Sequence, residues 1–262
     1  MGVRKFYFFA HRCSDDTHEQ ILKLQQVFDI TAFVMAEDVE RPQLVAYRYV
    51  YTQFDHEFDW VAYIDGDEFL FSPSNPDLRE TLESFSYSKI SGVCAYWACF
   101  GSSGHVEEPD GLLISNYKWR HRLDAPVNRH VKSIVMGRQG QYFDVSSNAH
   151  IFKTRHGLID ENGRPITQGL TDYEPTHARL RINHYVVQSR SYFLNQKKRS
   201  GAPDAGRDLV RPESWWDDND KNDVFDESLL SVEPILARAL QGPGVDRDAL
   251  VRPLVGSGAP AA

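Results

Sequence analysis

Three acidic side chains, Asp65, Asp67 and Glu68, directly follow the apolar run at residues 60–64 in the segment WVAYIDGDEFLF. Side chains two residues apart on an extended chain point to the same side, so Asp65 and Asp67 are expected to face a common space, while Glu68 faces away and braces the loop. Hard cations such as Mg²⁺ or Mn²⁺ prefer oxygen ligands, and a nucleotide diphosphate would complete their shell. The segment therefore predicts a divalent-cation site that receives a phosphorylated donor.

Other interpretations of this segment are tested by its spacing. A calcium-binding EF-hand loop needs an oxygen ligand at its fifth position and glycine at its sixth, where this chain has Phe69 and Leu70, so that motif is excluded. A metal-dependent phosphohydrolase with Asp65 as nucleophile shares the strand context and stays an alternative. A third interpretation is that the three acids have no chemical role and only cap the end of the strand at the surface.

Apolar runs of strand length alternate with helical patterns along the first part of the chain. Strands are expected at residues 6–10, 30–35 and 60–64, with helices between them, the second opened by Pro42. This alternation indicates an α/β fold with a mostly parallel sheet. Ligands bind beyond the carboxyl ends of such strands, where the acidic segment and residues 11–16 are both expected.

The later sequence has a different pattern. A short helix is expected at residues 78–85 and a strand at 92–97, followed by short strands and loops to about residue 153. A strand and then a helix are expected at residues 182–198. We expect an added β-rich part within one domain of residues 1–240, and a flexible tail at 241–262, which is rich in Gly, Pro and Ala.

Composition limits the partners and the compartment. A formal charge of −8 argues against nucleic acid or an anionic membrane as the main partner, although a local basic cluster would still allow peripheral membrane contact. Apolar runs fall well short of the roughly 18 residues that predict a transmembrane segment. Three cysteines cannot all be paired, which favours a reducing compartment and a cytoplasmic protein.

Four sequence blocks in order resemble the GT-A-fold glycosyltransferases, in the family 2-like group related to glycosyltransferase family 92. They are WVAYIDGDEFL, YWACFGSSGH at residues 96–105, HVKSIV at 130–135, and RINHYVVQSRSYFLNQKKRSG at 181–201. The resemblance extends to about Asp226. It implies a GT-A-like fold that lacks the usual first strand, because this chain starts at what would be the family's second strand.

The resemblance also implies an activity and a cofactor. It implies a glycosyltransferase, hexosyltransferase-like, that moves a sugar from a nucleotide-sugar donor, with UDP-sugar favoured, onto a glycan or lipid-linked acceptor, as in polysaccharide biosynthesis, by inverting transfer. Mn²⁺ or Mg²⁺ would be held by Asp65, Asp67 and His184. The missing first strand carries part of the nucleotide-base pocket, which leaves a non-catalytic nucleotide-sugar-binding remnant as a further alternative.

The remaining site residues follow from the same blocks and from their charge. The residues expected to bind the donor are Ser14, Asp16, Asp65, Lys132, Lys197 and Arg199. Trp97 and His105 are expected on the acceptor side. The base that deprotonates the acceptor hydroxyl is sought first among Glu107, Glu108 and Asp110, and second at Asp172 and Glu174.

Overall fold

The computed structural model describes residues 2–85, 89–139, 142–145, 148–199, 210–234 and 252–253. The chain forms two compact units. The larger unit contains Met1–Gly2 and Gln43–Leu230, and the smaller contains Val3–Pro42 and Ser231–Ala262. The sequence predicts a single domain at residues 1–240, and the division into two compact units does not decide whether they form one domain. The tail expected at residues 241–262 lies outside the described residues except for 252–253.

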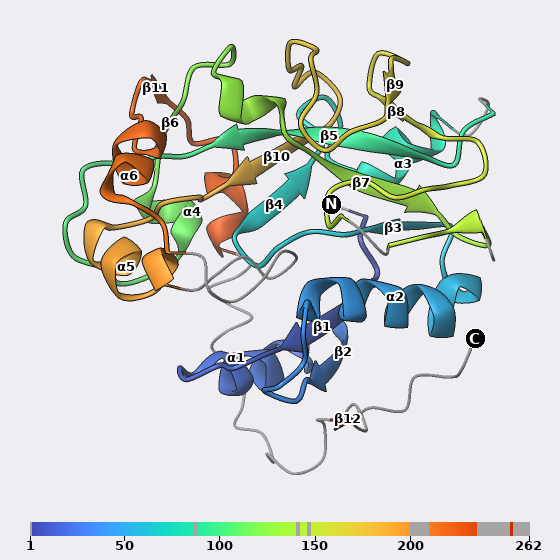
Figure 1. Cartoon of the computed structure of the whole chain (residues 1–262), viewed down its shortest axis with the longest axis horizontal. Helices are drawn as coiled ribbons and strands as arrows, with labels where there is room; N and C mark the ends of the chain where they lie inside the picture. The colour runs from blue at the N-terminus through green and yellow to red at the C-terminus, as the bar shows by residue number, and fades with distance from the viewer. Residues whose placement is uncertain are drawn as a thin grey trace. The chain divides into compact units, whose positions relative to one another are not determined.

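The smaller unit is a short parallel sheet with one helix. Its elements are β1 (Lys5–Ala10), α1 (Thr17–Leu24), β2 (Asp29–Val34) and β12 (Arg252–Pro253), with strand order β1-β2-β12 (Figure 1). β1 and β2 pair in parallel in the register Lys5↔Asp29 to Ala10↔Val34. The stacked rings of Phe9 and Phe33, 4.7 Å apart, fix that register. The two first strands and the helix between them are thus as the sequence predicts.

The larger unit is built on a sheet with strand order β3-β7-β5-β10-β4 (Figure 1). Its strands are β3 (Trp60–Ala62), β4 (Glu68–Phe71), β5 (Gly92–Cys99), β7 (Val131–Met136) and β10 (Arg181–His184). All eight residues of β5 are buried. The hairpin of β8 (Leu158–Asp160) and β9 (Pro165–Ile166) pairs with the start of β5, and β6 (Trp119–Arg120) pairs with β11 (Val224–Phe225).

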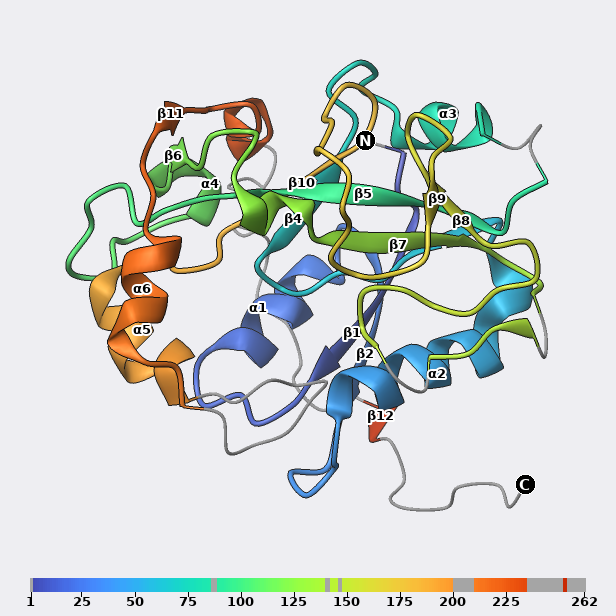
Figure 2. The ribbon, with the colours of Figure 1, turned by 45° about the horizontal axis from the view of Figure 1, so that its top comes forward.

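Two apolar cores cover the two faces of this sheet. The alternation of β5 places Val93, Trp97 and Cys99 in one core and Cys94 and Tyr96 in the other. Helix α3 (Leu78–Glu83) contributes to the first core, and helix α2 (Pro42–Phe54) packs aromatic rings against the second. Figure 2 shows α3 and α2 on opposite sides of the strands. β5 is therefore the central strand that fixes both layers.

Several short helices lie between these strands and after them in the described part of the chain. They are η1 (Asp55–Glu57), α4 (Leu113–Asn116), η2 (Pro126–Arg129), α5 (Arg190–Asn195), η4 (Lys197–Arg199), α6 (Glu213–Asn219) and η5 (Leu230–Val232). α5 and α6 pack through the rings of Phe193 and Trp215, which are stacked with centroids 5.7 Å apart. This contact anchors the segment that leads into η4, and η4 carries Lys197.

The sheet differs from the expected mostly parallel arrangement. β3 pairs with β7 and not with β1 or β2, so one sheet does not contain all three early strands. In the larger sheet, β3–β7, β7–β5 and β10–β4 are antiparallel, and only the β5–β10 and β5–β8 pairs are parallel. An apolar run predicts that a strand is buried, but the neighbour of that strand is set by residues far away in the sequence. The fold class is nevertheless mixed α/β.

A buried ion cluster ties β6 and β10 to the end of β11. The Asp226 carboxylate accepts hydrogen bonds from Arg120 Nε at 2.7 Å and Arg181 Nη2 at 2.6 Å. Burial alone would raise the pKa of Asp226, but Arg181 and Arg120 outweigh burial and hold this pKa well below its ordinary value. Asp226 is therefore ionised at neutral pH in the folded protein.

We expect Asp226→Asn to lower the free energy of unfolding at pH 7 by about 3 kcal/mol, because the buried Arg181 and the partly buried Arg120 lose their anion. The folded-state pKa of Asp226 is depressed, so its stabilisation is full above its ordinary pKa of about 4 and decreases as the pH falls below that value. Urea unfolding at pH 7 and at pH 3 measures both effects.

Asp124→Asn is the matched control, because Asp124 pairs with Arg122 on the open surface. Such exposed pairs contribute about 0–1 kcal/mol. An equal loss for Asp124→Asn and Asp226→Asn, or a loss at Asp226 that does not change with pH, would contradict the role given to the buried cluster.

Candidate functional site

The acidic loop, which we define as residues 65–68, connects β3 to β4 and is fastened to β10. Glu68 is the first residue of β4, and its partner across the antiparallel pair is His184. The backbone N–H of Tyr185 donates to the carbonyl of Asp67 at 3.0 Å, and that of Glu68 donates to the carbonyl of Asp65 at 3.1 Å. The backbone of the loop is thus held by its own turn and by the end of β10.

Asp65 is held by three side chains from two elements. Its Oδ1 accepts from Lys132 Nζ of β7 at 2.8 Å, from Tyr47 OH of α2 at 3.3 Å, and from Gln43 Nε2 of α2 at short range. Gln43 and Tyr47 are four residues apart and share one face of the helix. Asp65 keeps 33% of its side chain exposed, so the carboxylate is fixed without being enclosed.

Glu68 and Lys132 form the buried base of the loop. Glu68 Oε2 accepts from the backbone N–H of Asp65 at 3.1 Å and lies 3.8 Å from Lys132 Nζ. Lys132 is 1% exposed in its side chain and Glu68 is fully buried. Burial raises the pKa of Glu68 well above its ordinary value, whereas neighbouring acids, with Glu68 foremost, raise the pKa of Lys132 against the effect of burial. Glu68 thus contacts the backbone of Asp65, as expected of a residue that braces the loop.

Asp67 has a separate set of partners. Its Oδ2 accepts from Lys197 Nζ of η4 at 2.9 Å, and its Oδ1 lies 3.6 Å from Nε2 of His184. Burial alone would raise the pKa of Asp67, but Lys197 and His184 outweigh burial and hold this pKa well below its ordinary value. The two aspartates of the motif therefore pair with different lysines, Asp65 with Lys132 of β7 and Asp67 with Lys197 of η4.

The residues around Asp67 fit a divalent cation in part. Ligands of one octahedral cation stand about 3 Å apart when adjacent and about 4.2 Å apart when opposite, for bonds of about 2.1 Å. The 3.6 Å between Asp67 Oδ1 and His184 Nε2 falls between these two distances, so the two atoms would have to move by about 0.6 Å to become adjacent ligands of one cation. Across the described ranges no group of three His, Cys, Asp or Glu side chains could hold a metal. A cation here would take its other ligands from substrate phosphates and water.

Three imidazoles surround the indole of Trp97 beside the acidic loop. The ring of His130 stacks on it at 4.6 Å, and the rings of His184 and His150 lie at 4.2 and 5.3 Å. Burial, and then Lys132, lowers the pKa of His150 to about 4, so that its imidazole is neutral at pH 7. Trp97, expected on the acceptor side, is buried with these imidazoles packed around its ring.

The other acceptor-side candidate, His105, and the candidate bases lie on the loop after β5. His105 Nε2 is hydrogen-bonded to the carbonyl of Asn116 at 3.1 Å. Glu107, Glu108 and Asp110 are exposed. Of these three acids, Glu108 acts electrostatically on Tyr192 of α5, on which Asp67 of the acidic loop also acts.

Tyr192 connects the acidic loop with the acceptor-side loop electrostatically. Burial raises the pKa of Tyr192, Lys197 lowers it, and both Asp67 and Glu108 raise it further. Tyr192 is therefore within electrostatic range of both Asp67 and Glu108.

The other predicted residues are distributed as follows. Ser14 and Asp16 belong to the smaller unit, between β1 and α1. Arg199 is the last residue of η4. Lys198, next to Lys197, pairs with Glu213 of α6 at 2.5 Å. The structure thus brings Asp65, Asp67, Lys132, Lys197 and His184 together in the larger unit.

Four residues of the site were not predicted from the sequence. They are Gln43, Tyr47, His130 and His150. The first two carry a usable signal, because polar groups four residues apart on a helix share a face. His130 was in a quoted block, but His150 stands in an irregular segment without any pattern that would mark it.

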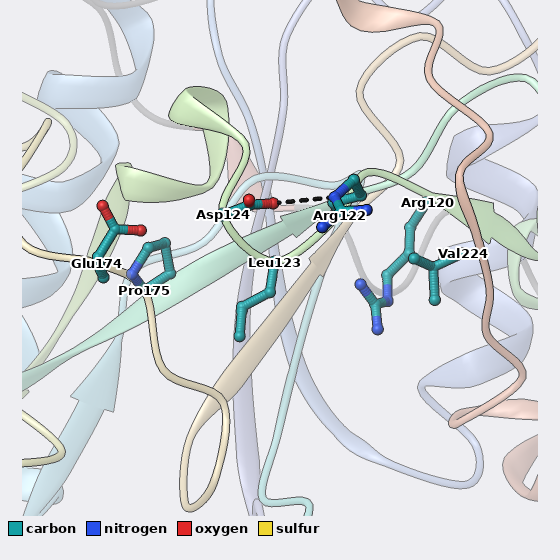
Figure 3. A pocket seen from close by; sticks show the side chains of 7 residues that line it. All are labelled: Arg120, Arg122, Leu123, Asp124, Glu174, Pro175 and Val224. Carbon is teal, nitrogen blue, oxygen red and sulfur yellow. Dashed lines mark hydrogen bonds and ion pairs between the residues drawn. The ribbon is translucent and has the colours of Figure 1, made fainter.

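A separate hollow of about 440 Å³ lies elsewhere on the larger unit. Its lining residues are Arg120, Arg122, Leu123, Asp124, Glu174, Pro175 and Val224. Figure 3 shows the ion pair of Arg122 and Asp124 at this hollow, at 3.3 Å. Of the acids considered as bases, Glu174 lies here, where it pairs with Arg129. None of the acidic-loop residues lines the hollow.

Two further observations concern redox state and membranes. Cys13, Cys94 and Cys99 are free thiols. In the described ranges, no helix combines the length and the apolar character needed to cross a membrane.

A comparison with known proteins finds a distant relative from rice. No protein-family model matches the chain. A protein of Oryza sativa subsp. japonica, described as a glycosyltransferase family 92 protein, is 26% identical over 236 residues. The match covers 82% of this chain and 37% of the rice protein, so the chain spans little more than a third of the length of this relative. The chain is therefore similar to a glycosyltransferase of family 92 across most of its length.

We expect Lys132 and Lys197 to resist acylation by acetic anhydride, because Lys132 is buried against Asp65 and the half-buried Lys197 is held in an ion pair with Asp67. Lys89 and Lys221 are exposed and serve as reactive references in the same sample. Peptide mass spectrometry measures the extent of modification at each lysine. Asp67→Asn should make Lys197 more reactive and leave Lys132 protected; equal reactivity of all four lysines would contradict the described ion pairs.

Proposed function

We propose that this protein is a metal-dependent glycosyltransferase that moves a sugar from a nucleotide-sugar donor to a hydroxyl acceptor. One observation supports this function best. Oδ1 of Asp67, on the acidic loop, lies 3.6 Å from Nε2 of His184, the last residue of β10. The similarity to a family 92 glycosyltransferase over most of the chain supports the same class of reaction. Four finer points stay predictions: the hexosyl group, the UDP nucleotide, the glycan or lipid-linked acceptor and the inverting outcome.

The charges at the site suit a diphosphate leaving group. Negative charge grows on the nucleoside diphosphate as the glycosidic bond breaks, and a bound Mn²⁺ or Mg²⁺ would supply Lewis-acid stabilisation of that charge. Asp67 and His184 would hold the cation. Lys197, paired with Asp67, is the ammonium group placed to act on the diphosphate. Lys132 is buried and acts through Asp65 rather than by direct contact with phosphate.

The test of donor binding is calorimetry of UDP with the purified chain in Mn²⁺ and in EDTA. We expect Mn²⁺ to tighten UDP binding by about tenfold or more, which is about 1.4 kcal/mol. Asp67→Asn should abolish this gain, because it removes a charged ligand of the cation. Asp59→Asn is the matched control, since Asp59 is an exposed acid just before β3.

Two results of this experiment, and one result of a separate phosphatase assay, would count against the proposal. UDP binding that does not respond to Mn²⁺ would remove the metal-dependent donor site. An equal effect of Asp59→Asn and Asp67→Asn would show that the loss is not specific to the acidic loop. Phosphate release from phosphomonoesters, abolished by Asp65→Asn and independent of sugar nucleotides, would support a phosphohydrolase instead.

Glu108 is our choice for the base that deprotonates the acceptor hydroxyl. It is exposed and follows the acceptor-side loop, and it acts on Tyr192 together with Asp67. A base must stand within hydrogen-bond reach of the hydroxyl that attacks the sugar. The electrostatic link through Tyr192 favours Glu108 over Glu107 and Asp110.

We expect Glu108→Gln to lower the turnover number by about 10²–10⁴-fold, because general-base catalysis contributes a factor of that size. The affinity for UDP in Mn²⁺ should stay unchanged. UDP release from a panel of UDP-sugars with sugar acceptors measures turnover. Glu107→Gln is the adjacent control and should retain activity; equal losses in both variants, or a loss only in Glu107→Gln, would contradict the assignment.

A further inference from the structure

We propose that Lys132 and Glu68 are positioning residues that hold the acidic loop in one conformation, so that Asp65 and Asp67 are presented to the donor in a fixed arrangement. The presentation to a donor rests on the proposed function. The holding of the loop does not, because it is a property of the ligand-free chain. Neither residue needs to touch the substrate for this role.

The first observation is that Lys132 reaches the loop from a rigid strand. β7 pairs with both β3 and β5, and Lys132 is opposite Ala95 of the fully buried central strand. Its side chain is 1% exposed, and its ammonium group lies 2.8 Å from Asp65 Oδ1. A cation so placed fixes the carboxylate of Asp65 from inside the protein, while Asp65 itself stays partly open to solvent.

The second observation is that Glu68 holds the backbone of the same loop. Its Oε2 accepts from the N–H of Asp65, three residues earlier, at 3.1 Å. The backbone N–H of Glu68 in turn donates to the carbonyl of Asp65 at 3.1 Å. These two bonds close the turn on both sides. Together with Lys132, Glu68 therefore constrains both the main chain and the side chain of Asp65.

A purely structural role would make a different prediction. If Lys132 only compensated the buried carboxylate of Glu68, removing both groups together would be harmless, as buried ion pairs replaced by apolar residues often leave stability unchanged. If the pair positions the loop, removing both would restore stability but not the conformation of the loop. Positioning partners around a ligand typically change affinity by about 10- to 100-fold.

The first arm of the test is hydrogen exchange of the ligand-free chain, read on peptides that span residues 63–71. The variants are Lys132→Met, Glu68→Met, their double variant, and Glu68→Gln, which keeps an oxygen to accept from Asp65. We expect exchange in this peptide to be about tenfold faster or more in the three Met variants, and near the wild-type rate in Glu68→Gln. Wild-type exchange in all the Met variants would overturn the proposal.

Arg164→Met is the matched control, because Arg164 also serves a fully buried carboxylate, that of Asp160, at 2.5 Å. It should lower the melting temperature without changing exchange at residues 63–71. Faster exchange at residues 63–71 in Arg164→Met, equal to that in Lys132→Met, would show general loosening and would also overturn the proposal.

The second arm combines melting temperature with calorimetry of UDP in Mn²⁺. We expect Lys132→Met to lower the melting temperature, the double variant to recover most of it, and the UDP dissociation constant of the double variant to stay about 10- to 100-fold weaker than wild type. Wild-type affinity in the double variant would show that Lys132 and Glu68 only compensate each other's charge, and would contradict the presentation of the aspartates to the donor. Absence of UDP binding in the wild type would count against the proposed function, while the exchange arm still decides whether the pair holds the loop.

Discussion

Charge compensation at the acidic loop is the constraint on which the rest of the site depends. Three carboxylates within four residues repel one another, and burial of even one without a cation is costly. The protein meets this requirement with two lysines that come from different elements, Lys132 from β7 and Lys197 from η4. Each lysine can do so only because its own element is anchored, β7 within the central sheet and η4 directly after helix α5, which packs on α6.

The separation of the two aspartates follows from this arrangement. Asp65 is bound by Lys132, Tyr47 and Gln43 and works as a fixed point of the loop. Asp67 faces Lys197 and His184, and it is the carboxylate placed beside a nitrogen that can share a cation. An Asp-x-Asp motif that looks symmetric in the sequence is therefore asymmetric in the folded chain. The proposed division of labour, with Asp65 as organiser and Asp67 as ligand, rests on that asymmetry.

The central strand makes this precision possible. β5 is buried along its whole length and pairs with β7 on one side and with β8 and β10 on the other. Lys132 and His184 thus stand on two strands that share one neighbour, and their spacing is set by backbone hydrogen bonds rather than by loops. Sites on paired strands hold their geometry more closely than sites on loops do.

The sequence by itself determined the local features of this protein. The acidic motif after an apolar run, the strand of residues 92–97, the helix opened by Pro42 and the bracing role of Glu68 all follow from short-range patterns, because neighbouring side chains alternate or repeat at fixed periods. Only the tertiary structure decided the strand neighbours, which made the sheet mixed rather than mostly parallel, and the partner of each aspartate. Lys132 is 67 residues from Asp65 and Lys197 is 130 residues from Asp67, and contacts over such separations depend on how strands pair, which local periodicity does not encode.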